Sequence, residues 1–295
     1  MAPFKAGFIS ILGRPNVGKS TLFNALLGDK MAIVSARPQT TRNRILGIKN
    51  VDQAQLVFLD TPGIHDGRSR LNQRMVSVAV GTGQDADILL FLVEAVFPTI
   101  ENDKKVIDSV ETHRGVSFLV INKIDLIKKE KLLPMMDQYQ HLRDFQEIIP
   151  VSALTGEGID RLVDLLIQYL PESASLFPEE MITDQPERFL VSELIREKVI
   201  QQTHQEVPYS AAVVIESFKE HPEKNLVVIQ ATILVERDSQ KKILIGKGGQ
   251  KLKGIGEAAR KAVEAFLDQR VFLELWVTVE KDWTQDTRAL DRLGY

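Results

Sequence analysis

Gly13-Arg14-Pro15-Asn16-Val17-Gly18-Lys19-Ser20 lies between an apolar run at residues 8–12 and a helical pattern that starts at Thr21. In such a loop, glycines let backbone N–H groups wrap a polyphosphate, and lysine places a positive charge beside the β and γ oxygens. The serine hydroxyl is suited to hold Mg²⁺. The flanking strand and helix patterns supply the structural context that this motif needs, so the sequence predicts a site for a nucleoside triphosphate.

The composition is that of an ordinary globular chain. The 295 residues are 44% apolar and 26% charged, which predicts two domains, each large enough to bury its own core. The absence of cysteine excludes disulfides and thiolate metal sites and fits a reducing compartment. The net charge of −3 argues against general coating of nucleic acid, so any such contact must come from a local basic patch.

The first domain carries no pattern of a targeting or membrane segment. The apolar run at residues 88–93 is too short to cross a bilayer and has the length of a buried strand. Residues 1–8 lead directly into the phosphate-binding loop, so cleavage of a signal peptide there would destroy the site. We expect a cytoplasmic protein and leave open a peripheral fraction in contact with the inner membrane.

Short apolar runs alternate with amphipathic segments over residues 4–170. Strands that alternate with helices predict an α/β fold with a mainly parallel sheet covered on both faces and ligands at the carboxyl ends of the strands. The expected strands are residues 8–12, 44–51, 55–59, 87–93, 116–121 and 148–151, and the expected helices include residues 71–82 and 159–170.

The pattern changes after Pro171, where a stretch with two prolines and small polar residues begins. The next elements are predicted as helix, strand, strand, two helices around a glycine cluster, and strand. Their ranges are 189–203, 211–218, 226–235, 241–245 with 248–267, and 271–279. We therefore expect a first domain at residues 1–172, a linker at 173–183 and a small α+β domain at 184–295.

Asp60-Thr61-Pro62-Gly63 follows directly from the apolar strand at residues 55–59. A carboxylate at a strand end can hold Mg²⁺, and a residue without a side chain lets its N–H approach a γ-phosphate. The same four residues also make an ordinary structural turn. Their place after an apolar strand and a phosphate-binding loop favours the metal and phosphate role.

Asn122-Lys123-Ile124-Asp125 closes the strand at residues 116–121, and it predicts the choice of base. A carboxylate at Asp125 can accept both guanine N1–H and the exocyclic amino group, a pair of donors that adenine does not present. Ser152 and Ala153 end the following strand, and the backbone N–H of Ala153 is placed to reach guanine O6. Ser152-Ala153-Leu154 alone carries almost no information.

A polar segment, Pro38-Gln39-Thr40-Thr41-Arg42, precedes Asp60. A threonine hydroxyl in this segment could complete the Mg²⁺ shell when a triphosphate is bound, and the segment would relax when the γ-phosphate is lost. We favour Thr41 over Thr40 for this role. The alternative is an ordinary solvated loop.

Taken in order, residues 13–20, Thr41, 60–63, 122–125 and 152–154 resemble the motifs of the translation-factor-related GTPases. The resemblance implies a Ras-like G domain that hydrolyses GTP, with Lys19, Thr41 and Gly63 acting on the γ-phosphate and with Mg²⁺ held by Ser20, Thr41 and Asp60. The residues expected to contact the nucleotide are Gly13, Arg14, Pro15, Asn16, Val17, Gly18, Lys19, Ser20, Thr21, Asp60, Thr61, Pro62, Gly63, Asn122, Lys123, Asp125, Ser152 and Ala153.

Ile64 stands where many GTPases carry the glutamine that orients the attacking water. Because isoleucine cannot orient water, we expect slow intrinsic turnover. Related GTPases with an asparagine at the position of Asn16 use it to hold K⁺ beside the phosphates, so K⁺ stimulation is our hypothesis. The alternative for Asn16 is capping of the loop through hydrogen bonds from its side chain to the backbone.

A Gly-x-x-Gly turn at residues 246–249 joins two amphipathic helices in the second domain. The turn lets a nucleic-acid backbone approach closely, and lysines at and around it form the densest basic region of the chain. A helix C-cap or a solvated basic face explains the same pattern. The residues expected to bind RNA are Ile245, Gly246, Lys247, Gly248, Gly249, Lys251 and Lys253, with Ile245, Leu252 and Ile255 either flooring a groove or packing in the core.

The order of elements around this turn resembles a type II KH domain, the RNA-binding module found behind the G domain in one branch of these GTPases. The resemblance then spans the whole chain, and it implies binding to the 3′ end of 16S ribosomal RNA and help in 30S subunit maturation. We expect no DNA partner, and a monomer is the default for the oligomeric state, which the sequence leaves open. The alternative is a GTPase adaptor whose second domain docks on protein or on the inner membrane face, because a lysine-rich surface also suits anionic lipid. The two tryptophans and five histidines fall outside every motif.

Overall fold

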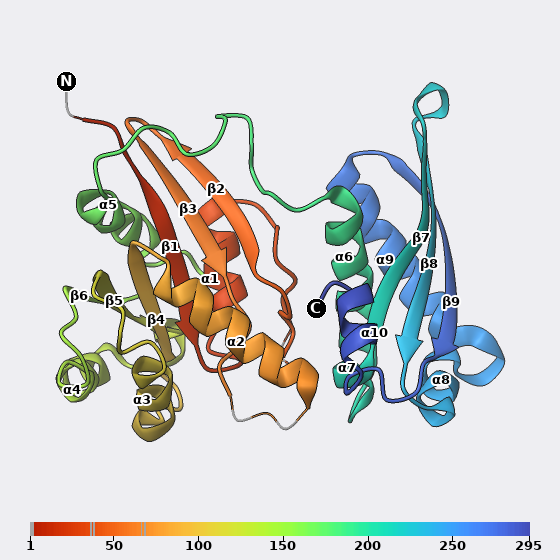
Figure 1. Cartoon of the computed structure of the whole chain (residues 1–295), viewed down its shortest axis with the longest axis horizontal. Coiled ribbons are helices and arrows are strands. Elements are labelled where there is room, and N and C mark those ends of the chain that lie inside the picture. Colours follow the sequence, from red (N-terminus) through yellow and green to blue (C-terminus); the bar gives the residue numbers. More distant parts are fainter. Residues whose placement is uncertain (1–2, 36, 38, 66, 68) are drawn as a thin grey trace. The chain divides into compact units, whose positions relative to one another are not determined.

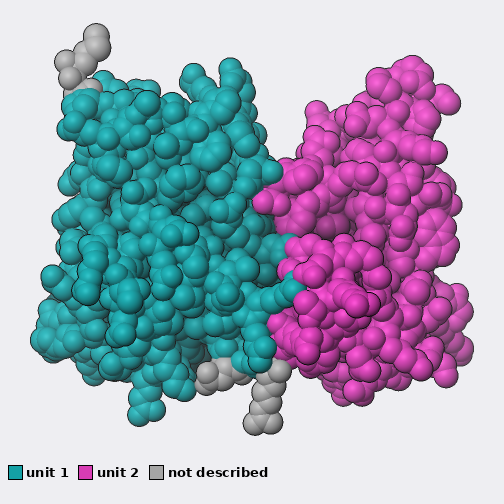
Figure 2. Space-filling model, in the orientation of Figure 1, with its two compact units in different colours: residues 1–32, 41–67, 73–184 teal, residues 33–40, 68–72, 185–295 magenta. Residues whose placement is uncertain are grey.

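The computed structural model describes residues 3–35, 37, 39–65, 67 and 69–295, so Pro38 of the predicted polar segment lies outside the described residues. The chain forms two compact units, coloured separately in Figure 2. The first unit contains residues 1–32, 41–67 and 73–184. The second contains residues 185–295 together with two short earlier segments, residues 33–40 and 68–72.

A six-stranded sheet forms the centre of the first unit, with the strand order β2-β3-β1-β4-β5-β6 (Figure 1). Strand β2 runs antiparallel to β3 and the other neighbours are parallel, so the predicted mainly parallel sheet is confirmed. The strands are β1 Lys5–Gly13, β2 Ile45–Val51, β3 Ala54–Asp60, β4 Ile88–Glu94, β5 Val116–Asn122 and β6 Glu147–Pro150.

The inner strands of this sheet are apolar along their length because both faces are covered. All residues of β3 are buried, and β4 is buried up to Val93. The helices that connect the strands are α1 Lys19–Leu27, α2 Arg70–Gln84, α3 Ile100–Asp108, α4 Leu132–Tyr139 and α5 Ile159–Tyr169. In parallel strands joined by such crossovers, the carboxyl ends meet at one edge, where the predicted nucleotide motifs lie.

The second unit contains a three-stranded sheet in the order β7-β8-β9, with β7 Ala212–His221, β8 Leu226–Val235 and β9 Arg270–Val279. Strands β7 and β8 are antiparallel, and β8 and β9 are parallel. The helices are α6 Glu187–Gln202, α7 Val207–Ser210, α8 Asp238–Ile245, α9 Gln250–Leu267 and α10 Thr287–Arg292. This is the predicted α+β order.

One face of this sheet packs against α6 and α9, as seen at the right of Figure 1. The buried stripe of α9 contains Ile255, Ala259 and Val263, which pack in two apolar clusters with residues of α6 and β8. Trp283 is fully buried, and its indole N–H donates to the carbonyl of Ser210 at 2.9 Å. Among the described residues, no helix is long and apolar enough to span a membrane.

Candidate functional site

The loop at residues 13–18 connects β1 to α1, and Gly18 precedes the first turn of the helix with φ 102°. That φ favours glycine, and a Cβ at this position would also collide with the side-chain amide of Asn122. The backbone N–H groups at the start of α1 have no intrahelical acceptor, so the helix dipole and these donors make the loop an anion site.

Lys19 is buried at the start of α1 and its ammonium donates to loop carbonyls, to Arg14 at 2.9 Å and Gly13 at 3.2 Å. Burial lowers the pKa of Lys19 to about 8, an effect that the Asp60 carboxylate opposes and that Arg14 reinforces. A bound polyphosphate would favour the charged form of this ammonium, because it brings negative charge into a buried site.

Three oxygen-bearing side chains converge at the end of β3. The Oδ2 atom of Asp60 accepts from Ser20 at 2.8 Å and from Thr41 at 3.2 Å, and the two hydroxyls are 2.8 Å apart. Within the described residues, the buried Oδ1 atom of Asp60 has no hydrogen-bond partner. Burial raises the pKa of Asp60 to about 6, although Lys19 and the two hydroxyls favour its charged form.

This donor set fits Mg²⁺, which prefers hard oxygen ligands and is held in phosphate sites by a few protein oxygens together with the substrate. The orphaned oxygen of Asp60 and the two hydroxyls are the protein groups that would hold it. The hydroxyl of Thr40 is engaged differently, since it donates to the carbonyl of Arg37 at 2.8 Å. The geometry therefore supports Thr41 rather than Thr40 as the metal-binding threonine.

The Asp60–Gly63 turn closes against the phosphate-binding loop. A Cβ on Gly63 would lie 2.8–2.9 Å from backbone atoms of Pro15, so only glycine fits at this approach. The N–H of Ile64 donates to the carbonyl of Gly13 at 3.2 Å, and the Ile64 side chain packs against an apolar cluster of the unit. An apolar side chain held in this way cannot orient an attacking water.

Asn122 holds the predicted base-binding end of the site together. Its amide donates to the carbonyl of Val17 at 2.9 Å, and its Oδ1 accepts from the N–H of Ala153 at 3.0 Å. We expected that N–H to reach guanine O6, and in this structure it has a protein partner. Ser152 donates to a carboxylate oxygen of Asp125 at 2.6 Å, which orients the acceptor predicted to select guanine.

Side chains that were not among the predicted site residues anchor the loop from outside. Asp103 of α3 is buried and accepts from Arg14 at 2.5 Å and from the Tyr139 hydroxyl at 2.7 Å. Burial and this hydrogen bond raise the pKa of Tyr139. Lys123 donates to the carbonyl of Asn16 at 2.7 Å and pairs with Glu94. No local pattern identifies these partners, because they come from separate elements.

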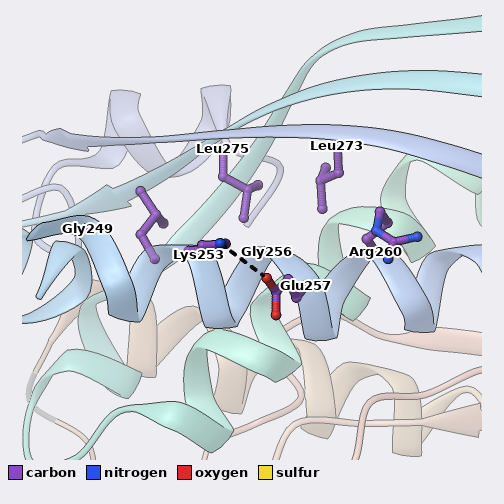
Figure 3. Close-up of a pocket in the computed structure, with 8 residues that line it drawn as sticks. Gly249, Lys253, Gly256, Glu257, Arg260, Leu273 and Leu275 are labelled. Carbon is purple, nitrogen blue, oxygen red and sulfur yellow. Dashed lines mark ion pairs between the residues drawn. The ribbon is translucent and has the colours of Figure 1, made fainter.

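In the second unit, the Gly-x-x-Gly turn lies between the end of α8 at Ile245 and the start of α9 at Gln250. Beside it, a groove of about 420 Å³ lies between α9 and β9. In Figure 3, Leu273 and Leu275 project from β9 toward the helix, and Lys253 is paired with Glu257 at 4.0 Å. The groove is lined by Gly249, Leu252, Lys253, Gly256, Glu257, Arg260, Leu273 and Leu275.

Of the residues predicted to bind RNA, Gly249 and Lys253 line the groove, and Lys247 and Gly248 are exposed in the adjoining turn. Ile255 does not floor the groove, because it is fully buried in the core with Leu244 and Ile233. Ile245 is half-buried against the same core. Leu252 lines the groove and also packs against this core. Leu273 and Leu275 of β9, which were not among the predicted residues, supply the rest of the apolar wall.

Comparison with known proteins finds a match for each of the two units. A family model for 50S ribosome-binding GTPases matches residues 8–123, and a KH domain model matches residues 206–284. The chain is 56% identical to GTPase Era of Syntrophus aciditrophicus over 292 residues, which covers 99% of this chain and 95% of the relative. It is 54% identical to GTPase Era of Geobacter metallireducens over 293 residues, covering 99% and 98%.

Two solved structures match along nearly the whole chain. One is a crystal structure of Era in complex with MgGDPNP and nucleotides 1506–1542 of 16S ribosomal RNA, with a TM-score of 0.96, 42% identity and 99% of each chain covered. The other is a variant of Aquifex aeolicus Era bound to GDP and AlF₄⁻, with a TM-score of 0.95, 41% identity and the same coverage.

The fold and site define a P-loop GTPase with a KH domain behind its G domain. At this identity over the full length, the chain belongs to the GTPase Era family. It is therefore a GTP-hydrolysing enzyme.

Proposed function

We propose that this GTPase binds Mg²⁺·GTP through the residues assigned above, and that its second unit binds the 3′ end of 16S ribosomal RNA during 30S subunit maturation. The observation that carries the RNA part is the groove between α9 and β9, which opens beside a glycine turn with exposed Lys247 and Lys253. A related Era crystallised with nucleotides 1506–1542 of this RNA supports the same assignment. KH grooves take about four nucleotides of single strand by clamping the backbone against such a turn.

At the nucleotide site, each group has a defined task. Lys19 and the loop N–H groups neutralise the β- and γ-phosphates, and Asp125 selects the base. Mg²⁺, when bound by Ser20, Thr41 and Asp60, neutralises charge that develops on the phosphate oxygens. Gly63 brings its backbone close to the γ-phosphate because it has no side chain.

Turnover without a water-orienting side chain at Ile64 should be slow, and K⁺ is our candidate accelerator. The backbone at Asn16 is left-handed, with φ 65°, and its carbonyl is fixed by Lys123. An ion held here would place a positive charge beside the phosphates, as an arginine finger does. Single-turnover GTP hydrolysis in K⁺ and Na⁺ buffers tests this idea, and equal rates would remove it.

We also propose that the nucleotide controls RNA binding through the residues before Thr41. Residues 33–40 group with the second unit, where Arg196 of α6 donates to the carbonyl of Thr40 and the N–H of Val34 donates to Glu197 at 3.0 Å. Thr41, the next residue along the chain, is a candidate Mg²⁺ ligand. Ordering Thr41 on GTP would therefore act directly on a segment that α6 holds.

The test is binding of the full chain to a 16S RNA fragment of nucleotides 1506–1542, in competition with anionic phospholipid vesicles. Our proposal predicts that the RNA displaces the protein from the vesicles and that Gly248→Asp weakens RNA binding by at least about 30-fold while GTP binding is retained. If vesicles displace the RNA, the second unit is a membrane-docking domain. Salt dependence does not separate the two, because both ligands are polyanionic.

A further inference from the structure

The second unit exposes two aromatic side chains on β9 that the nucleotide site and the groove do not use. Phe272 is 54% exposed and Trp276 is 46% exposed. Alternate residues of a strand point to opposite faces, so these two share one face, and Leu273 and Leu275 lie on the other. The rings therefore project from the outer face of the sheet, while the leucines form the wall of the groove.

Single exposed apolar side chains are common on protein surfaces, whereas exposed apolar residues that share one face mark an interaction site. Along the strand the two positions are roughly 13 Å apart, at about 3.3 Å per residue. Strand β9 is paired only with β8 in the described sheet, so its other side is an open edge. A bound nucleic acid that leaves the groove across this edge reaches Phe272 and Trp276 without crossing another β-strand.

The neighbours of the rings also suit a nucleic acid. Phe272 is in register with Val228 of β8 and, beyond it, Lys219 of β7. Lys219 and Arg270, at the same end of the face, are both exposed. Glu274, the acidic residue between the two rings, accepts a hydrogen bond from Gln230 at 2.8 Å, so its carboxylate is tied to the sheet.

We propose that the outer face of β9, with Phe272 and Trp276, is a stacking platform for bases of single-stranded RNA that continues from the groove. Aromatic side chains bind successive bases by stacking regardless of sequence, and cations at the margin hold the phosphates. A KH groove takes about four nucleotides, so a longer RNA needs a second surface. This inference rests on the proposed RNA-binding function and assigns the path of the RNA beyond the groove.

The experiment compares two RNAs with the full-length protein: nucleotides 1506–1542 of 16S ribosomal RNA, and the shortest fragment of it that still binds. Trp276→Ala and Phe272→Ala should each raise the Kd for the long RNA by about tenfold and leave the Kd for the short RNA unchanged. Trp276→Phe should restore most of the affinity. Thr278→Ala, an exposed residue on the same face without a ring, is the matched control and should change neither Kd.

A spectroscopic readout follows from the tryptophan content. The chain has two tryptophans, and Trp283 is fully buried, so Trp276 dominates any change in emission on binding. The long RNA should quench this emission, and the short RNA should not. Equal Kd values for wild type and both alanine variants with the long RNA, together with loss of binding in Gly248→Asp, would overturn the platform and leave the groove intact. An equal rise in Kd for both RNAs in the alanine variants would also overturn the platform, since the rings would then act through the fold or the groove.

Discussion

The nucleotide site and the groove differ in how far their polar groups are buried. Asp60, Asn122 and Ser152 are almost entirely buried, and each is held by hydrogen bonds to another part of the site. Lys247 and Lys253 at the groove are exposed. A buried set of groups that orient one another is organised for one ligand, whereas exposed cations that contact phosphates tolerate many nucleic-acid sequences. Substitutions should therefore be costly and specific at the first site and graded at the second.

The largest effect is expected at Asp125. In Asp125→Asn, the carboxylate becomes an amide that cannot accept two donors from guanine, and xanthine, with an acceptor in place of the exocyclic amino group, becomes the better partner. We expect GTP affinity to fall by about 10³-fold and XTP to bind more tightly than GTP. Titration with both nucleotides measures this switch. Retained preference for GTP would show that the base is selected elsewhere.

A second large effect is expected for Gly63→Ala. The added Cβ would meet the backbone of Pro15 at 2.8–2.9 Å, so the turn or the phosphate-binding loop must shift. A displacement of this kind next to the γ-phosphate should lower kcat for GTP hydrolysis about 100-fold while GDP binding changes little. Gly81→Ala is the control, because a Cβ at Gly81 meets nothing within 4 Å. Normal turnover in Gly63→Ala would refute the assigned role.

A substitution at the groove should have a smaller effect, and it should change RNA binding rather than nucleotide binding. A Cβ at Gly248 meets nothing within 4 Å, but the residue has φ 58°, a left-handed conformation that Asp and Asn adopt more readily than most other residues, so Gly248→Asp adds a negative charge together with backbone strain. We expect the Kd for the 16S fragment to rise by at least about 30-fold through repulsion of phosphate, with an unchanged Kd for GTP. Gly248→Asn adds an uncharged side chain and should lose much less affinity for the 16S fragment. Equal losses in both variants would mean that backbone geometry, rather than charge, limits binding.

The two adjacent threonines sharpen the assignment of the metal site. Thr41→Ala should weaken Mg²⁺ binding in the GTP complex about tenfold, because its hydroxyl lies beside Ser20 and Asp60. Thr40→Ala removes only the hydrogen bond to the carbonyl of Arg37 and should leave the Mg²⁺ titration close to that of wild type. The reverse pattern would exchange their roles.

The smallest effect concerns pH. Because burial raises the pKa of Asp60 to about 6, the carboxylate is ionised at neutral pH and takes up a proton as the pH falls through 6. Mg²⁺ must displace that proton, so the gain in GDP affinity that Mg²⁺ provides should decrease several-fold between pH 7 and pH 5. GDP affinity measured over the same pH range in EDTA serves as the reference, because without Mg²⁺ it reports only the ionisation of the nucleotide. A pH-independent Mg²⁺ effect would contradict the assignment.

The sequence predicted the parts of the molecule in which the signal is local. The bounds of β8 agree with the predicted range 226–235, and the nucleotide motifs lie at the strand ends of the first sheet as expected. These motifs are contiguous because each binding group sits directly after a strand. The glycine turn at residues 246–249 likewise lies between two helices, as its pattern predicted.

Contacts between distant elements could not be predicted in this way. The Arg14–Asp103–Tyr139 cluster joins the phosphate-binding loop to α3 and α4, and nothing in the local sequence of either helix marks it. The groove wall also depends on which residues of β9 face α9. A helical pattern at Ile255 is equally compatible with a groove floor and with the core, and only packing decides that it is core.

The central proposal is that the nucleotide controls RNA binding through the segment before Thr41. The direct test is the Kd of the full chain for nucleotides 1506–1542 of 16S RNA, measured with Mg²⁺·GDPNP and with GDP in the same buffer. We predict tighter binding with GDPNP, and loss of that difference in Thr41→Ala. Equal affinity in the two nucleotide states of the wild-type protein would contradict the account.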